Sequence, residues 1–476
     1  MVSTFVIYDL VFLVVFSLAV VVFLYIRRRN LQRQGLLYLY RTKIGIKFIE
    51  WTGNKFPKTL KALQYFVVAS GHILMISMTY LIVRFSYFYI TSDVAAKALK
   101  VPVIVPLVPY LPDIFNIDFL PPFYFTYWII IIAIIAIPHE FAHGIFASLN
   151  KIKIHSTGFG FLGPFLAAFV EPDEKQMEKT SKFTQLSVLA SGTFANVLFT
   201  VIFGIIFWLF FVSAFTPAGV MFQSYATVRA PISAIDKING TLVNSPTEIS
   251  GLLDLNESFV KFEIANTSLF ASLAQLKTLA EEGGDKDVTL ILDSPAFRAK
   301  LAGAISEING EKITSLDDLI KVINSNSPGD NVTIKTILSS REEKEYVIQL
   351  ANFSGRPFLG IGVPNTEREG LLGWIYKLIT KIKDPFVYYQ SGLGDFGWFI
   401  YNLLWWTVLV SLSVALVNML PVGIFDGGRF FFLTVWGITG SKKAGEVAYK
   451  ISTYIILLII AVLMVKYLLV LPQIFN

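Results

Sequence analysis

Six long runs of apolar, almost uncharged residues constrain this chain more than any other feature. Each run approaches or exceeds the roughly 20 residues that an α-helix needs to cross about 30 Å of hydrocarbon. Apolar residues make up 54% of the chain and charged residues only 16%, which excludes a disordered chain, a coiled coil and a simple soluble enzyme. The sequence therefore predicts a polytopic α-helical membrane protein with about six transmembrane helices. The predicted spans are about 5–26, 63–83, 123–148, 183–213, 396–421 and 451–471.

The distribution of basic residues predicts an orientation for these spans. Residues 27–62 contain ten Lys or Arg and one acid, Glu50, so the positive-inside rule assigns them to the cytoplasm. The arginines that start at Arg27 follow the first apolar run instead of preceding it, which favours a retained span over a signal peptide. Counting spans then places 149–182 inside, and the N-terminus and 214–395 outside. Basic residues that flank spans indicate contact with the lipid bilayer and no nucleic-acid partner.

The stretch 214–395 differs in composition from the rest and is interpreted as a soluble insertion. Between 217 and 365, 18 acids face 13 bases, whereas the remainder carries 27 bases and 16 acids. After the insertion, the connection around Arg429 is expected to be a cytoplasmic loop between the last two spans. The predicted parts are an N-terminal two-span region (1–92), a first half of the membrane core (93–214), two modules of the insertion (215–290 and 291–365), and a second half of the core (366–476).

A weak internal repeat supports two modules in the insertion. The residues of 234–240 (AIDKING) match those of 304–310 (AISEING). Apolar and polar alternation that ends in Asn-Gly predicts a strand that runs into a tight turn. Ser315, followed by Asp317 and Asp318, predicts the start of a helix after the second copy.

Two segments of the membrane core are predicted to be irregular or extended. Residues 101–122 contain too many prolines for a helix and are expected to form an extended outer loop or cap. Residues 152–172 alternate in polarity and contain three glycines, so short strands or a re-entrant hairpin are expected there. Such backbone near the membrane must be buried in protein or line a cavity.

The third run ends in a motif that carries chemistry, His139-Glu140-Phe141-Ala142-His143. On a helix, the four-residue spacing puts both imidazoles on one face, where they can chelate Zn²⁺. Glu140 between them can accept a proton from the attacking water and pass it to the leaving amine. An acid that follows 20 uncharged residues is costly in lipid, so Glu140 is functional by default.

A catalytic zinc site needs a third protein ligand and one open position. The chain has no Cys and only two other histidines; His72 is expected to form a buried hydrogen bond and His155 to be solvated. Asp426 is the better candidate, because it follows the uncharged residues 396–425 and the topology gives it the same depth as the histidines. The glycines at 427 and 428 would let backbone approach closely.

With these motifs, the chain resembles the site-2 protease family of intramembrane zinc metalloproteases, in its archaeal-type branch. His139 to His143 match the family's H-E-x-x-H, and Asn418, Pro421 and Asp426 match its Asn-x-x-Pro…Asp-Gly motif. Gly192 and Asn196 match its Gly-x-x-x-Asn, and residues 168–174 (AFVEPDE) are similar to this branch.

The resemblance implies roles for these residues. His139, His143 and Asp426 would be the zinc ligands and Glu140 the general base and acid. Asn196 would contact the substrate backbone or orient the site, with Asn418 and Pro421 also on the substrate side.

The same resemblance implies an α/β PDZ-like character for the extracytoplasmic insertion and regulated intramembrane proteolysis of transmembrane proteins as the function. The sequence leaves two alternatives open. One is a transporter or channel with intramembrane acids, although no inverted repeat is visible. The other is a catalytically inactive membrane scaffold with peptide-binding modules.

Overall fold

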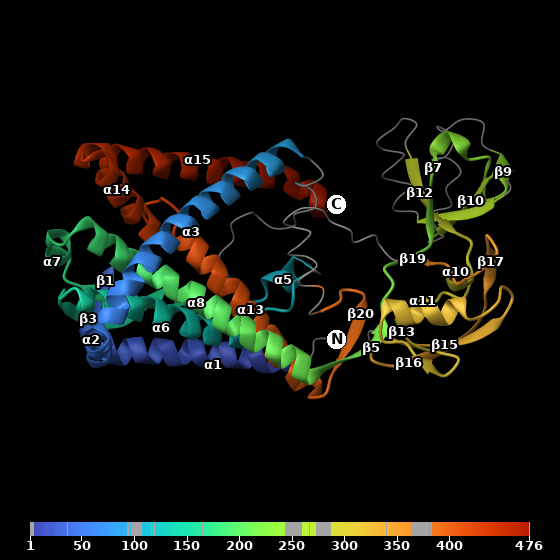
Figure 1. Cartoon of the computed structure of the whole chain (residues 1–476), viewed down its shortest axis with the longest axis horizontal. Helices are drawn as coiled ribbons and strands as arrows, with labels where there is room; N and C mark the ends of the chain where they lie inside the picture. The colour runs from blue at the N-terminus through green and yellow to red at the C-terminus, as the bar shows by residue number, and fades with distance from the viewer. Residues whose placement is uncertain are drawn as a thin grey trace. The chain divides into compact units, whose positions relative to one another are not determined.

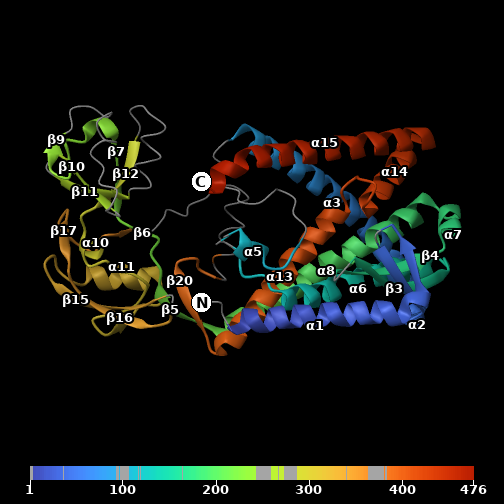
Figure 2. The same cartoon turned by 180° about the vertical axis from the view of Figure 1, so that it is seen from behind.

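The computed structural model divides into two compact units (Figures 1 and 2). The first, the membrane unit, contains residues 1–210 and 398–476; the second, the insertion unit, contains 211–397. The structure describes residues 4–35, 37–92, 96, 107–115, 117, 120–162, 165–242, 259–265, 267–272, 287–338, 340–362, 380 and 383–475.

All six predicted spans are helices that are long and apolar enough to cross a membrane. The prediction of a polytopic α-helical membrane protein is confirmed at this level. The helices are α1 (Thr4–Arg27), α3 (Pro57–Thr91), α6 (Phe125–Leu149), α8 (Lys182–Ala214), α13 (Gly394–Asn418) and α15 (Lys442–Phe475).

Some helix ends differ from the prediction. Helix α3 begins at Pro57, six residues before the predicted span. The prediction counted only uncharged residues, whereas the helix also includes Lys58 and Lys61. The connection around Arg429 was expected to be a loop, and this is wrong: it forms α14 (Asp426–Thr439). Fourteen residues rise only about 21 Å, too little to span a bilayer, which is why an apolar-run search misses this helix.

The prediction that 101–122 contains no helix is also wrong for one turn, α5 (Leu111–Ile114). Pro112 lies in the first turn of α5, where a proline costs no hydrogen bond. Residues 101–106 of the same segment lie outside the described residues.

The membrane helices pack around a core formed by α3, α6, α8, α13 and α14. Helix α8 runs opposite to α6, since Val188 contacts His143 while Asn196, two turns later, contacts His139. The core lies at the end of α6 that carries the histidines. Its fully buried members are Val67, Ala147, Ala190, Ala415, Met419 and Phe430.

A four-stranded antiparallel sheet adjoins this end of α6. Its strands are β1 (Leu31–Gln34), β2 (Leu37–Thr42), β3 (Ile154–Leu162) and β4 (Phe165–Pro172), in that order, so β4 is an edge strand. The expected strand hairpin at 152–172 is therefore present, extended by two strands from the N-terminal segment. Between the first and second spans, η1 (Arg28–Asn30) precedes β1, and α2 (Ile46–Lys55) follows β2.

An ion pair ties this sheet together across β3. Arg41 in β2 donates to both carboxylate oxygens of Glu171 in β4, at 2.9 and 3.0 Å, and Ser156 in β3 donates to the same carboxylate. These hydrogen bonds, with that of Arg41 the largest cause, hold the pKa of Glu171 below its usual value. Helix α7 (Glu174–Lys179) then leads from β4 to α8.

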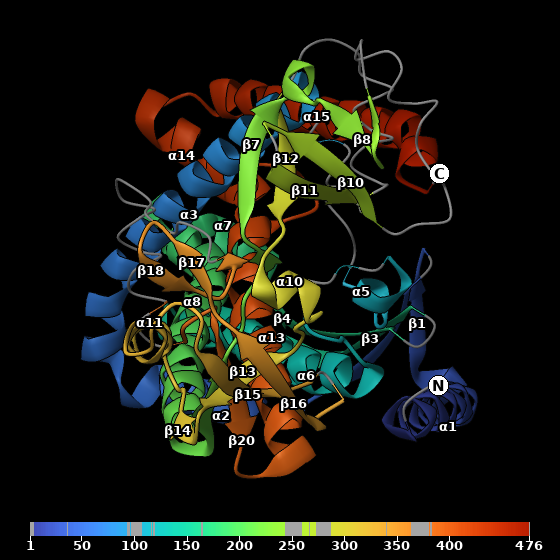
Figure 3. The same ribbon diagram turned by 90° about the vertical axis from the view of Figure 1, so that its right-hand side faces the viewer.

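The insertion unit contains two larger sheets. One has the order β7-β12-β11-β10-β8-β9, of which Figure 3 shows the first four strands side by side, and the other β16-β15-β13-β5-β20. Strand β5 leaves α8 and pairs with β20, which leads to α13, so the two connections of the insertion form an antiparallel pair.

The bounds in the first sheet are β7 (Thr227–Pro231), β8 (Lys237–Ile238), β9 (Thr241–Leu242), β10 (Phe259–Ile264), β11 (Thr267–Ser272) and β12 (Asp287–Leu292). In the second sheet they are β5 (Phe215–Val220), β13 (Ala304–Ile308), β14 (Glu311–Lys312), β15 (Asn331–Ile337), β16 (Glu343–Gln349) and β20 (Val387–Ser391). Short elements complete the unit: β6 (Ser224–Tyr225), η2 (Ile232–Ala234), α10 (Pro295–Arg298), α11 (Leu316–Asn324), β17 (Ala351–Phe353), β18 (Arg356–Phe358) and β19 (Ile361–Gly362).

The two copies of the sequence repeat adopt the same turn. Asn239-Gly240 and Asn309-Gly310 both have positive φ at both positions, and each connects two paired strands. Each asparagine also makes the same two bonds to a neighbouring strand, its Oδ1 accepting from the N–H of Lys261 or Thr333. The predicted helix after the second copy is α11, and Ser315 and Asp318 cap it reciprocally. The counterpart of α11 after the first copy falls on residues outside the described ones.

Helix α6 receives its N-terminal cap from another helix. Its own N-cap residue, Tyr124, makes no side-chain cap. The buried carboxylate of Asp9 in α1 instead accepts hydrogen bonds from the N–H groups of Phe125 (2.8 Å) and Thr126 (2.9 Å), and from the hydroxyls of Tyr110 and Thr126. This carboxylate satisfies orphan donors at the positive end of the helix dipole, so it fixes where α6 begins.

We predict that Asp9→Ala lowers the free energy of unfolding in detergent micelles by about 2 kcal/mol, because it removes a cap and leaves buried donors without a partner. Amide exchange should speed up in peptides that contain Phe125 and Thr126. Val15→Ala, at an exposed position of the same helix, is the control. Unchanged exchange at the start of α6 would show that the cap does not hold this helix.

Candidate metal centre

His139 and His143 lie on one face of α6, as their spacing predicts. Their Nε2 atoms are 3.1 Å apart and point to the same place. Both side chains are largely enclosed, with exposed fractions of 8% and 12%. Two imidazole nitrogens this close together could both bind one metal ion.

Helix α8 fixes the protonation of both rings. Nδ1–H of His143 donates to the carbonyl oxygen of Val188 at 2.7 Å, which leaves Nε2 as the free lone pair. The amide nitrogen Nδ2 of Asn196 lies 3.0 Å from Nδ1 of His139, while the buried Oδ1 of the same amide has no hydrogen-bond partner among the described residues. A flip of the amide exchanges these two atoms; Oδ1 would then accept from Nδ1–H of His139 and leave the second Nε2 free as well. Asn196 is thus an orienting residue behind the ring.

Gly192 makes the close approach of α8 possible. A Cβ atom at this position would collide with the Nε2 atoms of His139 and His143. Because glycine has no side chain, the backbone of α8 can lie directly against the Nε2 atoms of both histidines. This physical role explains the glycine of the Gly-x-x-x-Asn motif, since Gly192 and Asn196 lie one turn apart on the face toward α6.

Asp426 reaches the histidines from the other half of the chain. Its Oδ2 lies 3.5 Å from Nε2 of His139 and 3.4 Å from Nε2 of His143. Asp426 is the first residue of α14, so it does not close α13, which ends at Asn418. It lies at the positive end of the α14 dipole, which favours a carboxylate.

A tight turn between α13 and α14 sets the position of Asp426. Met419 and Leu420 are buried and anchor the turn. Side chains at Gly427 and Gly428 would collide with the backbone of Met419 and Val422 respectively. Only glycine therefore lets α14 start where its carboxylate meets α6, as the sequence predicted.

The three ligand atoms have the spacing that zinc requires. Two ligands each about 2.05 Å from a tetrahedral zinc lie about 3.3 Å from one another. The three distances here are 3.1, 3.4 and 3.5 Å. His139, His143 and Asp426 are the group that could hold a metal ion among the described residues, and the donor set of two imidazoles and one carboxylate suits zinc.

Glu140 lies beside this group without belonging to it. Its Oε2 accepts a hydrogen bond from the N–H of Val170 in β4 at 3.0 Å. Glu140 and His139 also line a cavity of about 460 Å³, together with Leu166, Ala167, Ala168, Val410 and Asn418. A carboxylate held by a strand and open to this cavity is free to exchange protons with what the cavity contains.

The remaining sequence candidates separate into two groups. Asn418 lines the cavity, whereas Pro421 lines a different one between α3, α14 and α15, where its carbonyl accepts from Ser452. His72 makes the expected hydrogen bond, to Val68. His155 lies 3.3 Å from Asp173, and neither histidine belongs to the metal group.

Sequence reasoning missed the backbone partners of the site. The carbonyl of Val188 and the N–H of Val170 act through main-chain atoms, which every residue type offers, so no pattern could reveal them. Ser411 in α13, which donates to the carbonyl of Asn196, was also missed.

Comparison with known proteins agrees with this geometry. No curated protein matches the chain. The model of peptidase family M50 matches residues 127–463, a range that includes His139, His143, Asn196 and Asp426. Because this match covers well over half of the chain, the chain belongs to peptidase family M50, the site-2 protease family.

Proposed function

We propose that this protein is an intramembrane zinc metalloendopeptidase that hydrolyses peptide bonds within or near transmembrane helices. The observation that carries this proposal is the metal group of His139, His143 and Asp426, with zinc-like spacing, beside Glu140 in a cavity among apolar helices. Family membership supports a membrane metalloprotease over a transporter or an inactive scaffold.

Each residue then has one task. Bound by His139, His143 and Asp426, a zinc ion would supply the Lewis-acid chemistry that activates a water at neutral pH. Glu140 accepts the proton of that water and later gives it to the leaving amine. Asn196 and the carbonyl of Val188 keep both histidines in the tautomer that offers Nε2.

We predict that Glu140→Gln abolishes cleavage of a transmembrane substrate but retains zinc. Asp426→Ala should lose both zinc and cleavage. The reason is that Glu140 moves protons, whereas Asp426 supplies one of three ligand atoms. Metal content of the purified variants, measured with turnover in the same micelles, separates the two roles.

The matched control is Glu171→Gln, a carboxylate in the neighbouring β4 that pairs with Arg41 instead of the histidines. It should keep zinc and most activity. Loss of zinc in Glu140→Gln would make Glu140 a ligand, and full zinc in Asp426→Ala would remove Asp426 from the site.

The edge of β4 offers the substrate a backbone partner. A transmembrane helix must unwind before its peptide bond is accessible, and its freed N–H and C=O groups then need partners. Val170 points its N–H away from β3 toward Glu140, so by alternation Ala168 and Leu166 also point theirs outward. Both of these residues line the cavity. An extended substrate would therefore add to β4 as a further strand.

We predict that Ala168→Pro lowers the cleavage rate at least about tenfold while zinc stays bound, because one paired hydrogen bond at the strand edge is lost and the ring crowds the approach. Ala168→Ser keeps the N–H and is the control. If the proline variant cleaves at the normal rate, the substrate does not pair with this edge.

We further propose that the insertion is PDZ-like and selects substrates outside the membrane. A cavity of about 230 Å³ runs between α11 and residues 357–361, lined by Leu316, Leu319, Ile320 and Ile323. A helix and a neighbouring extended segment with an apolar floor are the arrangement by which PDZ domains bind extended tails.

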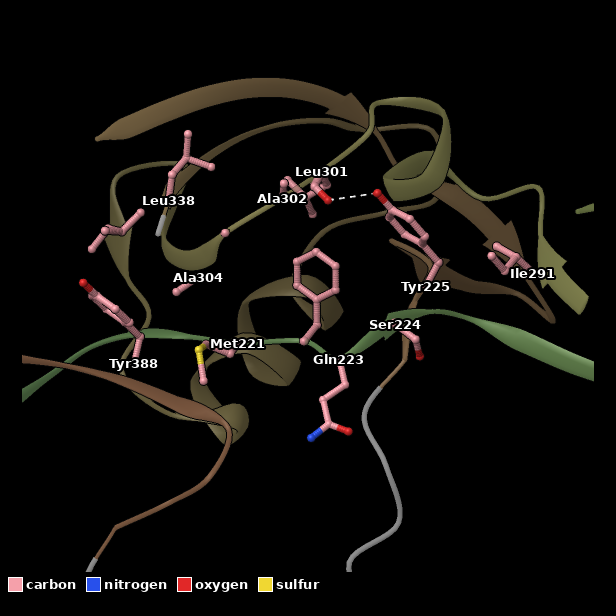
Figure 4. A pocket seen from close by; sticks show the side chains of 13 residues that line it. Met221, Gln223, Ser224, Tyr225, Ile291, Leu301, Ala302, Ala304, Leu338 and Tyr388 are labelled. Atoms are coloured by element: carbon pink, nitrogen blue, oxygen red, sulfur yellow. Dashed lines mark hydrogen bonds between the residues drawn. The ribbon is translucent and has the colours of Figure 1, made fainter. Parts of the chain in front are cut away.

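A second cavity of the insertion unit, about 470 Å³, lies beside the extended residues 221–225 (Figure 4). Tyr225 donates from its hydroxyl to the carbonyl of Leu301 and closes one side, while Tyr388 and Leu338 lie on the other. The lining is mostly apolar, which favours burial of side chains over binding of charged groups.

Ile320 is half-exposed and lines the 230 Å³ cavity beside α11, which we call the α11 groove. We predict that Ile320→Glu slows cleavage of substrates with an extended extracytoplasmic tail. A short model helix without a tail should be cleaved at the normal rate. Lys321→Gln makes the same change of charge at an exposed neighbouring position outside the groove, and it should act like the wild type. Equal slowing of both substrates by Ile320→Glu would contradict a filtering role.

We also propose that cleavage occurs toward the cytoplasmic side. The basic residues 27–62, which the positive-inside rule assigns to the cytoplasm, include β2 and α2. Strand β2 belongs to the same sheet as β4, which contacts Glu140. The site and the basic segment therefore share one end of the membrane unit.

A further inference from the structure

Helix α2, in the connection between the first two spans, packs one of its faces tightly against α6. Ile49 is completely buried, and a Cβ at Gly53 would lie 3.0 Å from the carbonyl of Ile145 and from Ser148 of α6. In return, a Cβ at Gly144 would lie 3.0 Å from Ile49. The close packing of these two small residues fixes α2 against the end of α6 that follows the histidines.

The opposite face of α2 is aromatic and basic. At 100° per residue, Lys47, Phe48, Trp51 and Lys55 share one side of the helix, away from Ile49. Phe48 is 53% exposed and Trp51 50% exposed. The rings of Phe48 and Trp51 are stacked with centroids 6.2 Å apart, and Nζ of Lys55 lies 4.5 Å from the Trp51 centroid.

The chain places this face at a membrane surface. The first candidate span ends at Asn30 and the second begins at Pro57, so α2 lies between the ends of two spans. Its 10 residues cannot cross a bilayer. The connection 27–62 has ten basic residues and one acid, Glu50, which is a strong excess of positive charge.

We propose that this face of α2, made of Lys47, Phe48, Trp51 and Lys55, binds anionic phospholipid headgroups. Trp and Phe rings favour the level of the headgroups, and lysines beside them attract anionic lipids. The two neighbouring spans hold the face where these lipids are concentrated, whereas a soluble partner would have to compete with the bilayer for it. The family match begins at residue 127, so the protease chemistry of the matched region does not account for this surface.

The lipid-binding face contacts the turn of α6 that carries the metal group through an aromatic pair. Phe141, between the two histidines in sequence, has its ring centroid 6.1 Å from that of Phe48. A Cβ at Gly45, just before α2, would collide with the Phe141 ring, with its nearest atom at 2.6 Å. Lipid bound to α2 would thus steady the turn of α6 that carries the site.

The test uses the full-length protein in lipid nanodiscs and needs neither zinc nor cleavage. Because the chain has no cysteine, Asn54→Cys at an exposed position of α2 can carry a single environment-sensitive fluorophore. Nanodiscs contain equal mole fractions of phosphatidylglycerol and phosphatidylcholine, with bromine on the acyl chains of one or the other. We expect the fluorescence to be quenched about threefold more strongly when phosphatidylglycerol carries the bromine than when phosphatidylcholine does.

The double variant Lys47→Gln with Lys55→Gln should lose this preference, and Trp51→Ala should weaken quenching by both lipids. Lys442→Gln with Lys443→Gln removes the same charge at the exposed start of α15 and should keep the preference. Equal quenching by both lipids in the parent protein would overturn the proposal. Quenching by neither would also overturn it and assign the face to a protein partner or a second copy.

Discussion

The convergence of three ligand atoms at one point inside a helical bundle is the constraint on which the membrane unit depends. His139 and His143 come from α6, and Asp426 is the first residue of α14, more than 280 residues later in the chain. Two features of the backbone allow this convergence. Gly192 has no side chain to block the histidines, and Gly427 and Gly428 permit the turn before α14. The buried core of α3, α6, α8, α13 and α14 lies beside this point, so packing energy holds the site together.

Helix α6 is held at both ends by parts of the chain that the family match does not include. Asp9 of α1 caps its first residues, and Gly53 of α2 packs against its last turns. Strand β2 also extends the sheet whose edge contacts Glu140. The residues before 127 therefore form a scaffold around the reactive helix, and changes there can alter the site without contacting it.

The sequence predicted the spans and the shared face of His139 and His143, because apolar run length and the spacing of H-E-x-x-H depend on local periodicity alone. Asp426, far away in the chain, was proposed from its depth after an uncharged run and from the family resemblance. It also predicted α11 and both Asn-Gly turns from cap and turn residues. It missed α14, which is shorter than a span and follows directly on an irregular turn. The cap from Asp9 was unpredictable, since a single acid in an apolar run does not name its partner.

Strand β4 contacts Glu140 and also carries the edge to which we propose that the substrate adds. Its Val170 N–H holds the carboxylate of Glu140, and two residues earlier Ala168 presents the groups that would pair with a substrate. Two residues of a strand span about 6.8 Å. If the substrate adds to β4 as proposed, this spacing would set the distance between its bound backbone and the Glu140 carboxylate. A protease that binds its substrate in this way would choose the cleaved bond by the register of the bound backbone, and would tolerate many side chains at the point of cleavage.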